Sequence, residues 1–169
     1  MKKNGFTLIE LMIVIAILGV VLAIAIPAFN ETIDKQKLKD GTEQIYSAIQ
    51  NARTLSKSRS EKIYINVNTS SSDWCVGINA GAACDCTNTT SCNINRIIKS
   101  DFDSLSIKSG NTMNGQFFDP VRSVLGSSGG SVTLVSKLGK EATVNLSVTG
   151  DVSHCSAAGS TRIGDYPKC

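Results

Sequence analysis

The chain has 169 residues, enough for one domain with a buried core and too few for two ordinary domains. Its formal net charge of +3 is too small to indicate a polyanionic partner by itself. With 41% apolar and 5% aromatic residues, three prolines and one histidine, the composition excludes collagen-like, mucin-like and histidine-rich metal-binding chains. Six cysteines are the unusual feature, because an even number predicts a disulfide framework if the chain leaves the cytoplasm.

The N-terminal segment separates charge from apolarity. Lys2 and Lys3 come first, and residues 11–29 then carry no charge. As a helix this uncharged segment would be about 28 Å long, close to the roughly 30 Å of a hydrocarbon core. The positive-inside rule then places the N-terminus in the cytoplasm and the rest of the chain beyond a membrane that it crosses once.

Two simpler interpretations of this segment are a secretory signal peptide and a plain membrane anchor. A signal peptidase could cut at the small-residue site Ala23-Ile24-Ala25. Glu10 counts against both interpretations, because a carboxylate at the head of an apolar run is costly in lipid and neither function uses it.

The residues Gly5-Phe6-Thr7-Leu8-Ile9-Glu10 precede an apolar run that contains Pro27. This pattern resembles the type III leader of type IV prepilins and type II secretion pseudopilins. The resemblance implies that a prepilin peptidase cuts after Gly5 and methylates the amine of Phe6. It also implies residence in the bacterial inner membrane, then assembly with other major and minor pilins into an extracellular pilus, with no cofactor.

Glu10 and Pro27 have physical roles in such a segment. A carboxylate in lipid must find a cation or stay protonated, and the free amine of Phe6 on a neighbouring chain is the nearest candidate. Apolar helices that leave the bilayer must bury one another, so one segment would serve as anchor and then as filament core. Pro27 predicts a bend or local melting of the helix near residues 19–28.

Helical periodicity continues past this segment and then gives way to alternation. The apolar helical face consists of Leu38, Ile45, Ala48, Ile49, Ala52 and Leu55, with Gly41 weakening the helix by about 1 kcal/mol relative to alanine. Alternation from residue 62 predicts antiparallel strands at Ile63, Ile65, Val67; Trp74, Val76, Ile78; Val132, Leu134; and Val144, Leu146, Val148. The expected divisions are a leader (1–5), a membrane or filament-core helix (6–29), an amphipathic helix (30–61) and a β-rich globular domain (62–169).

A second resemblance covers segments of this later region in chain order. Ala52-Arg53, residues 63–67, Trp74-Cys75-Val76-Gly77, residues 115–120 and residues 146–150 look like the FimT/FimU (GspH) class of minor pilins and pseudopilins. The resemblance implies an α+β pilin-like fold, with a long N-terminal helix packed on antiparallel sheet. It implies a non-enzymatic minor pilin that primes a filament or sits at its tip. A DNA-binding FimT-type pilin for natural transformation and a type II secretion pseudopilin are the alternatives.

Export would place the cysteines in an oxidising environment. Cys155 and Cys169 are expected to pair, in a loop that resembles the C-terminal disulfide-bounded region of type IV pilins. The other four admit three connectivities, and a bond between Cys84 and Cys86 is the least comfortable because one residue separates them. The alternative is a zinc site formed by Cys75, Cys84, Cys86 and Cys92. The spacing of these four cysteines departs from that of usual zinc ligands.

DNA-binding FimT proteins carry a Gly-Arg-x-Arg motif near the C-terminus, where this chain has Gly150-Asp151-Val152-Ser153. The replacement of both arginines favours a structural minor pilin over a DNA-binding one. The remaining candidates for weak phosphate contacts are Lys137, Lys140, Arg162 and Lys168. His154 is expected in an exposed loop and Asp101 with Asp103 in a solvated turn, and no catalytic motif accompanies them.

Overall fold

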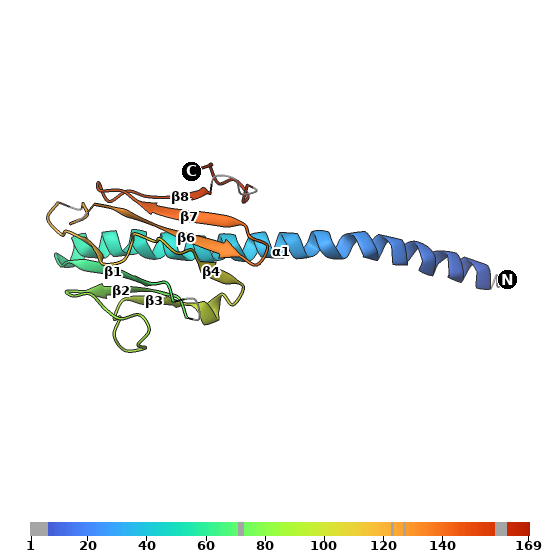
Figure 1. Ribbon diagram of the computed structural model, residues 1–169, viewed down its shortest axis with the longest axis horizontal. Coiled ribbons are helices and arrows are strands. Elements are labelled where there is room, and N and C mark those ends of the chain that lie inside the picture. The colour runs from blue at the N-terminus through green and yellow to red at the C-terminus, as the bar shows by residue number, and fades with distance from the viewer. Residues whose placement is uncertain (1–6, 71–72, 123, 127, 158–161) are drawn as a thin grey trace, which may run out of the picture. The chain divides into compact units, whose positions relative to one another are not determined.

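The computed structural model describes residues 7–70, 73–122, 124–126, 128–157 and 162–169, apart from the side chains of residues 27 and 28. Within these residues it contains one long helix, α1 (Leu8–Arg59), and eight strands (Figure 1). The chain divides into two compact units, Met1–Ile33 and Asp34–Cys169, and α1 contributes residues to both.

The first unit contains the apolar half of α1. Its large apolar side chains are all exposed, with exposed fractions that run from 37% at Ile33 to 77% at Leu8. Between Glu10 and Glu31 there is no charged residue, so this half of the helix has no charged face that could be turned to water. By length and composition alone, α1 is able to cross a membrane here.

The second half of α1 buries one face in the globular unit. Leu38, Ile45 and Ile49 are fully buried, as the helical spacing predicts. Gly41 lies at a close approach of this helix to the sheets, because a Cβ there would be 2.6 Å from Cδ1 of Leu105. A glycine that weakens the isolated helix thus permits its close packing against a strand.

The strands form two four-stranded sheets in which every pair is antiparallel (Figure 1). The first sheet has the order β3 (Asn95–Ile98), β2 (Cys75–Ala80), β1 (Ile63–Asn68), β5 (Gln116–Phe118). The second has the order β4 (Leu105–Ile107), β6 (Gly130–Ser136), β7 (Glu141–Leu146), β8 (Val152–Ser156). A short 3-10 helix, η1 (Lys99–Asp101), lies between β3 and β4.

Two buried hydrogen bonds connect these layers. Trp74, which immediately precedes β2, donates from Nε1 to the backbone oxygen of Leu105 on β4 at 2.8 Å. Ser56 on α1 donates from Oγ to the backbone oxygen of Phe118 on β5 at 3.1 Å. Both bonds satisfy polar groups inside the core, so they fix how the helix and the two sheets meet.

The predicted α+β class is confirmed, and so are the strands predicted from alternation at β1, β2, β6 and β7. Val148 is a correction: it lies beyond β7 and is 55% exposed, because the Gly150 N–H bonds the Ser147 oxygen and turns the chain. The other four strands, β3, β4, β5 and β8, were not predicted. The proposed divisions at residues 5, 29 and 61 remain predictions.

Candidate assembly segment and its disulfide-stapled domain

Glu10 lies in the first turn of α1 and is hydrogen-bonded to Thr7. The backbone N–H and Oγ1 of Thr7 donate to Oε2 of Glu10 at 3.0 and 2.8 Å, and the Glu10 N–H donates back to Oγ1 of Thr7 at 3.4 Å. This reciprocal arrangement is a capping box, which satisfies backbone donors at the helix start. The Thr-x-x-Glu spacing that signals this cap is visible in the sequence, but the sequence interpretation assigned Glu10 to assembly alone.

The structure describes some of the predicted leader and assembly residues and not others. Gly5 and Phe6, the predicted cleavage and methylation positions, lie outside the described residues. The Glu10 side chain is exposed, so a second chain could reach its carboxylate. α1 is helical on both sides of Pro27, so the described backbone is not locally melted there, and a bend at Pro27 remains a prediction.

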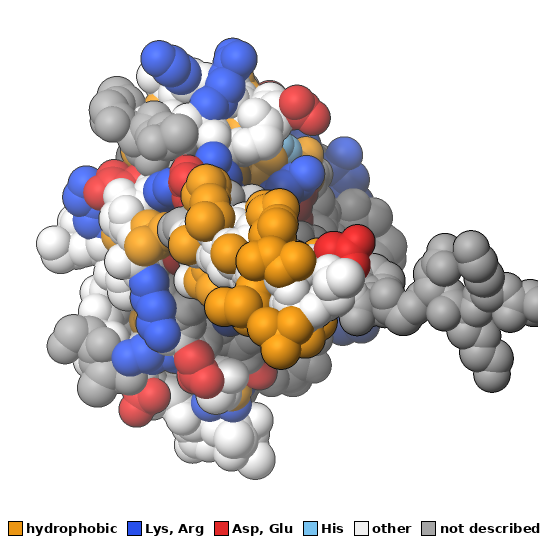
Figure 2. Space-filling model, turned by 90° about the vertical axis from the view of Figure 1, so that its right-hand side faces the viewer, with side chains coloured by type: hydrophobic (Ala, Val, Ile, Leu, Met, Phe, Trp, Pro, Cys, Tyr) orange, Lys and Arg blue, Asp and Glu red, His pale blue; other side chains and the backbone are white. Residues whose placement is uncertain are grey.

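The apolar half of α1 presents an uncovered surface. Apolar side chains gather at the centre of Figure 2, and the exposed ones of the first unit include Ile13, Leu18 and Phe29. Monomeric soluble proteins rarely expose contiguous apolar patches larger than a few hundred Å². A surface of this kind requires lipid or other protein chains to cover it.

The four clustered cysteines form two disulfides that pack against β2. Cys75 joins Cys86 and Cys84 joins Cys92, with Cα separations of 5.8 and 5.3 Å. Gly77 of β2 makes this packing possible, because a Cβ there would clash with Sγ of Cys92 and lie 2.8 Å from Cβ of Cys86. The structure thus selects one of the connectivities that the sequence left open, and the four cysteines of the alternative zinc set are disulfide-bonded.

The third disulfide fastens the C-terminal segment to the second sheet. Cys155 on β8 joins Cys169, the pairing predicted from the sequence, with a Cα separation of 5.1 Å. Lys168 pairs with Ser156 in an isolated parallel bridge, and the Ser156 N–H donates to the Pro167 oxygen at 2.8 Å. These contacts cover the outer edge of β8 at its last residue, which limits pairing of that end of the edge with another chain.

The same segment contacts α1 through the hydroxyl of Tyr166. Tyr166 is 3% exposed and donates from its hydroxyl to Oε1 of Glu43 at 2.7 Å. Burial, and next the hydrogen bond to Glu43, raise the pKa of Tyr166. His154 lies between the rings of Tyr46 and Tyr166, with centroid separations of 4.9 and 4.2 Å. The expectation that His154 occupies an exposed loop is therefore wrong, because β8 and these two rings hold it.

The candidate DNA-contacting residues are found at two places. Lys137 and Lys140 lie at the turn between β6 and β7, and Arg162 and Lys168 are exposed on the C-terminal segment. Lys137 is exposed, but Lys140 is only 7% exposed. The prediction that Lys140 contacts phosphate is therefore wrong, because this residue is buried in the folded domain.

The acid at the place of the FimT-type motif has a partner within the chain. Oδ1 of Asp151 accepts a hydrogen bond from Nη1 of Arg53 at 3.0 Å, and Oδ2 accepts one from Oγ1 of Thr149 at 2.8 Å. The hydrogen bond from Thr149, and next that from Arg53, lower the pKa of Asp151. The pair is exposed to solvent, so it contributes little to stability.

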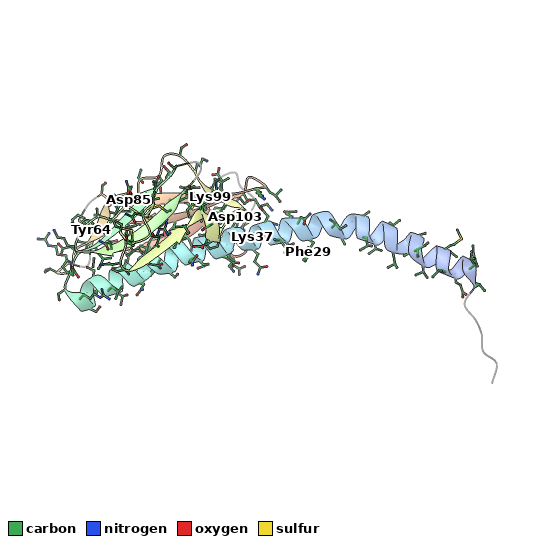
Figure 3. All side chains as sticks on the ribbon, turned by 90° about the horizontal axis from the view of Figure 1, so that it is seen from below. Phe29, Lys37, Tyr64, Asp85, Lys99 and Asp103 are labelled. Carbon is green, nitrogen blue, oxygen red and sulfur yellow. A yellow bond between two sulfur atoms is a disulfide. The ribbon has the colours of Figure 1, made fainter. Side chains whose placement is uncertain are left out.

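Other clusters of polar side chains are open to solvent. Lys37 and Asp40 on α1 line a hollow of about 300 Å³ with Asp101 and Asp103 (Figure 3 labels Lys37 and Asp103). Asp101 and Asp103 are exposed, in agreement with the predicted solvated turn. In the part of the chain that the structure describes, no three His, Cys, Asp or Glu side chains are grouped so as to hold a metal ion.

Comparisons with known proteins address the leader and the fold separately. Residues 1–26 match the prokaryotic N-terminal methylation motif. Over 39 residues the chain is 54% identical to the type IV major fimbrial protein FimA of Dichelobacter nodosus and to that of its strain VCS1703A. The aligned segment is 23% of this chain and 24% of those relatives, so the chain matches about a quarter of their length.

A solved structure is similar over most of the chain. The minor pseudopilin EpsH from the type 2 secretion system of Vibrio cholerae aligns with a TM-score of 0.50 and 8% sequence identity. The alignment covers 71% of this chain and 97% of EpsH. The chain is therefore pilin-like: it carries a prepilin-type leader, an N-terminal segment homologous to type IV fimbrial proteins, and a pseudopilin-like α+β fold.

Proposed function

We propose that this chain is a minor type IV pilin, a structural subunit without enzymatic activity that primes a pilus or sits at its tip. The observation that carries the proposal is the exposed apolar half of α1, from Leu8 to Ile33, directly behind a prepilin-type leader. Such a helix requires lipid before assembly and other pilin helices afterwards. Major and minor pilins, the prepilin peptidase and the inner membrane are the partners that follow.

Processing would prepare the assembly residues. Cleavage after Gly5 would leave Phe6 as the first residue, with a methylated amine. Glu10 lies four residues further on and has an exposed carboxylate. In a bundle of such helices this carboxylate would pair with the Phe6 amine of a neighbouring chain, which favours one register more than it adds stability.

A minor pseudopilin of a type II secretion system is the second candidate. The similarity to EpsH supports it, because EpsH is a minor pseudopilin and the alignment includes nearly all of its length. The three disulfides favour a pilus, since a subunit exposed outside the cell gains more from covalent staples than one held in the periplasm.

DNA uptake is the weakest of the candidates. Among the residues considered for DNA contacts, Lys137, Arg162 and Lys168 are exposed, and they remain available for phosphates. The acid at position 151 counts against this role, because it holds Arg53 in a pair and presents a negative charge where a DNA-binding relative has arginine.

Deletion of the gene, with complementation by the wild-type chain, separates these candidates. A minor pilin predicts lost or reduced piliation and twitching, with protein secretion unchanged. Lost secretion with pili intact would favour the pseudopilin. Lost transformation with pili and secretion intact would favour the DNA-binding role.

A further inference from the structure

The turn between β6 and β7 is fastened to the start of the globular unit's helix. Ser136, the last residue of β6, donates from Oγ to Oδ2 of Asp34 at 2.5 Å, and both residues are buried. Oγ of Ser136 also accepts from the Lys140 N–H at 3.2 Å, and the Ser136 N–H donates to the Lys140 oxygen at 2.9 Å. These bonds hold the tip of the hairpin, residues 137–139, beside Asp34.

Asp34 is close in sequence to the end of the apolar segment. It lies five positions after Phe29, the last apolar residue of the uncharged run. Five residues span about 7.5 Å in a helix and at most about 18 Å when fully extended. Whatever the orientation of the two units, the hairpin tip is therefore tethered within a short distance of the point where the chain would leave a membrane.

The tip has the composition of a membrane-surface contact. Leu138 is 57% exposed although it is a large apolar residue, and Lys137 beside it is exposed. Lys168 belongs to the same end of the sheet, because Ser156, its bridge partner, pairs with Ala142 at the start of β7. An apolar side chain flanked by lysines suits the interface of a bilayer that contains anionic lipids.

The opposite end of β7 provides a comparison within the same domain. Val148 in the turn between β7 and β8 is also apolar and is 55% exposed. It lies beyond the far end of the strand that begins at Glu141, so it is remote from Asp34 along the sheet. Both turns therefore expose an apolar residue. Of the two, the turn between β6 and β7 is the one bonded to Asp34, near the membrane segment.

We propose that before assembly the hairpin tip formed by Lys137, Leu138 and Gly139, with Lys168 beside it, rests on the anionic phospholipid headgroups of the membrane that holds α1. The inference depends on the proposed membrane-anchored stage. The contact restricts the orientation of the globular unit at the membrane surface, and it is released when the helix leaves the bilayer. Asp101 and Asp103, which lie beside Lys37, oppose lipid contact at that neighbouring site.

The test uses the full chain in vesicles and two matched tryptophan variants, Leu138→Trp and Val148→Trp. Each is compared with the wild-type chain, whose Trp74 is 2% exposed and supplies a constant background. The probes are vesicles of phosphatidylglycerol or phosphatidylcholine with brominated acyl chains, which quench tryptophan at short range. Near-ultraviolet circular dichroism and a thiol assay identify any variant that has not folded.

We expect Leu138→Trp to be quenched about twofold or more beyond Val148→Trp in phosphatidylglycerol, and less in phosphatidylcholine. The difference should shrink at 1 M salt, where the screening length falls to about 3 Å, and in the double variant with Lys137→Glu. Equal quenching of the two variants, or quenching that depends on the protein-to-lipid ratio and not on lipid charge, would overturn the proposal. Flotation with the vesicles reports anchoring separately: a chain that does not float contradicts the membrane-anchored stage itself.

Discussion

Ser136 donates a buried hydrogen bond of 2.5 Å to Asp34, a residue 102 positions earlier in the chain. The bond connects the last residue of β6 to the beginning of the globular unit's part of α1. A carboxylate that accepts a hydrogen bond inside a protein is strongly coupled to its donor, because either partner alone would be buried unsatisfied.

The variants Asp34→Ala and Ser136→Ala are each expected to lower the free energy of unfolding by about 1–3 kcal/mol. The double variant should be less destabilised than the sum of the two, by about 0.5–3 kcal/mol. Urea unfolding of the full chain in detergent measures all three. Ser58→Ala, which removes an exposed hydroxyl on α1, is the control and should change stability by less than about 0.5 kcal/mol. Strict additivity would show that Asp34 and Ser136 are not energetically linked.

Gly77→Ala is expected to prevent the two clustered disulfides from forming together. The added methyl would clash with Sγ of Cys92 and crowd Cys86, and these atoms belong to cross-linked, inflexible side chains. Alkylation of free thiols followed by mass measurement should find unpaired cysteines in the variant. Ala83→Ser, an exposed change directly before Cys84, should leave all six cysteines oxidised. Full oxidation of Gly77→Ala would contradict the close packing described for β2.

Tyr166→Phe is expected to lower the free energy of unfolding by about 1 kcal/mol, because the hydroxyl bond to Glu43 is lost. Burial raises the pKa of Tyr166, so the folded chain holds this tyrosine neutral at pH values where the unfolded chain ionises it. The resulting stability is complete below about pH 10, the ordinary tyrosine value, and declines as pH rises above it.

Unfolding measured between about pH 9 and 11 should therefore show a steeper loss for the wild-type chain than for Tyr166→Phe. Tyr64→Phe is the matched control, since Tyr64 is a half-exposed tyrosine on β1 packed beside Phe117. Parallel loss in the wild-type chain and Tyr166→Phe would contradict the account of Tyr166.

Glu10 has two roles to separate, one as a cap of its own helix and one as a partner for a neighbouring amine. Glu10→Ala should be cleaved normally but fail to enter filaments. Thr7→Ala removes the other half of the capping box, at a cost of about 0.5–2 kcal/mol to the helix start, and keeps the carboxylate. Filament incorporation, measured by immunoblotting of sheared pili with leader cleavage checked in parallel, should remain near normal for Thr7→Ala.

Equal failure of Thr7→Ala and Glu10→Ala would assign the effect to the cap. Glu10→Gln provides a further control, because the amide oxygen can still accept from Thr7 while the negative charge is removed. We expect Glu10→Gln to fail like Glu10→Ala.

Local patterns in the sequence predicted the long elements of this fold. The alternation that begins at Ile63 and the helical apolar face that begins at Leu38 each repeat over several residues. Each pattern is therefore long enough to specify an element and its buried face. β4 and β5 have three residues each, too few for a period to stand out. They exist because Leu105 and Phe118 are buried beside α1 contacts at Gly41 and Ser56, and because both strands pair with longer ones. Their presence depends on tertiary contacts.

The exposure of single residues was the least predictable property. Lys140 and His154 were both expected at the surface, but each is held by residues remote in sequence. The Lys140 hairpin closes on Asp34, and His154 meets rings at positions 46 and 166. The pairing of the four clustered cysteines likewise depends on the fold, because the two disulfides pack closely against Gly77 of β2. Conversely, the cap between Thr7 and Glu10 is local and could have been read from the spacing.

The intact mass of the non-reduced protein purified from membranes or pili tests the central claim most directly. We predict a chain that begins at Phe6, carries one added methyl group, and lacks the six thiol hydrogens that three disulfides remove. A chain that retains residues 1–5 and has no methyl group on Phe6 would contradict processing as a prepilin.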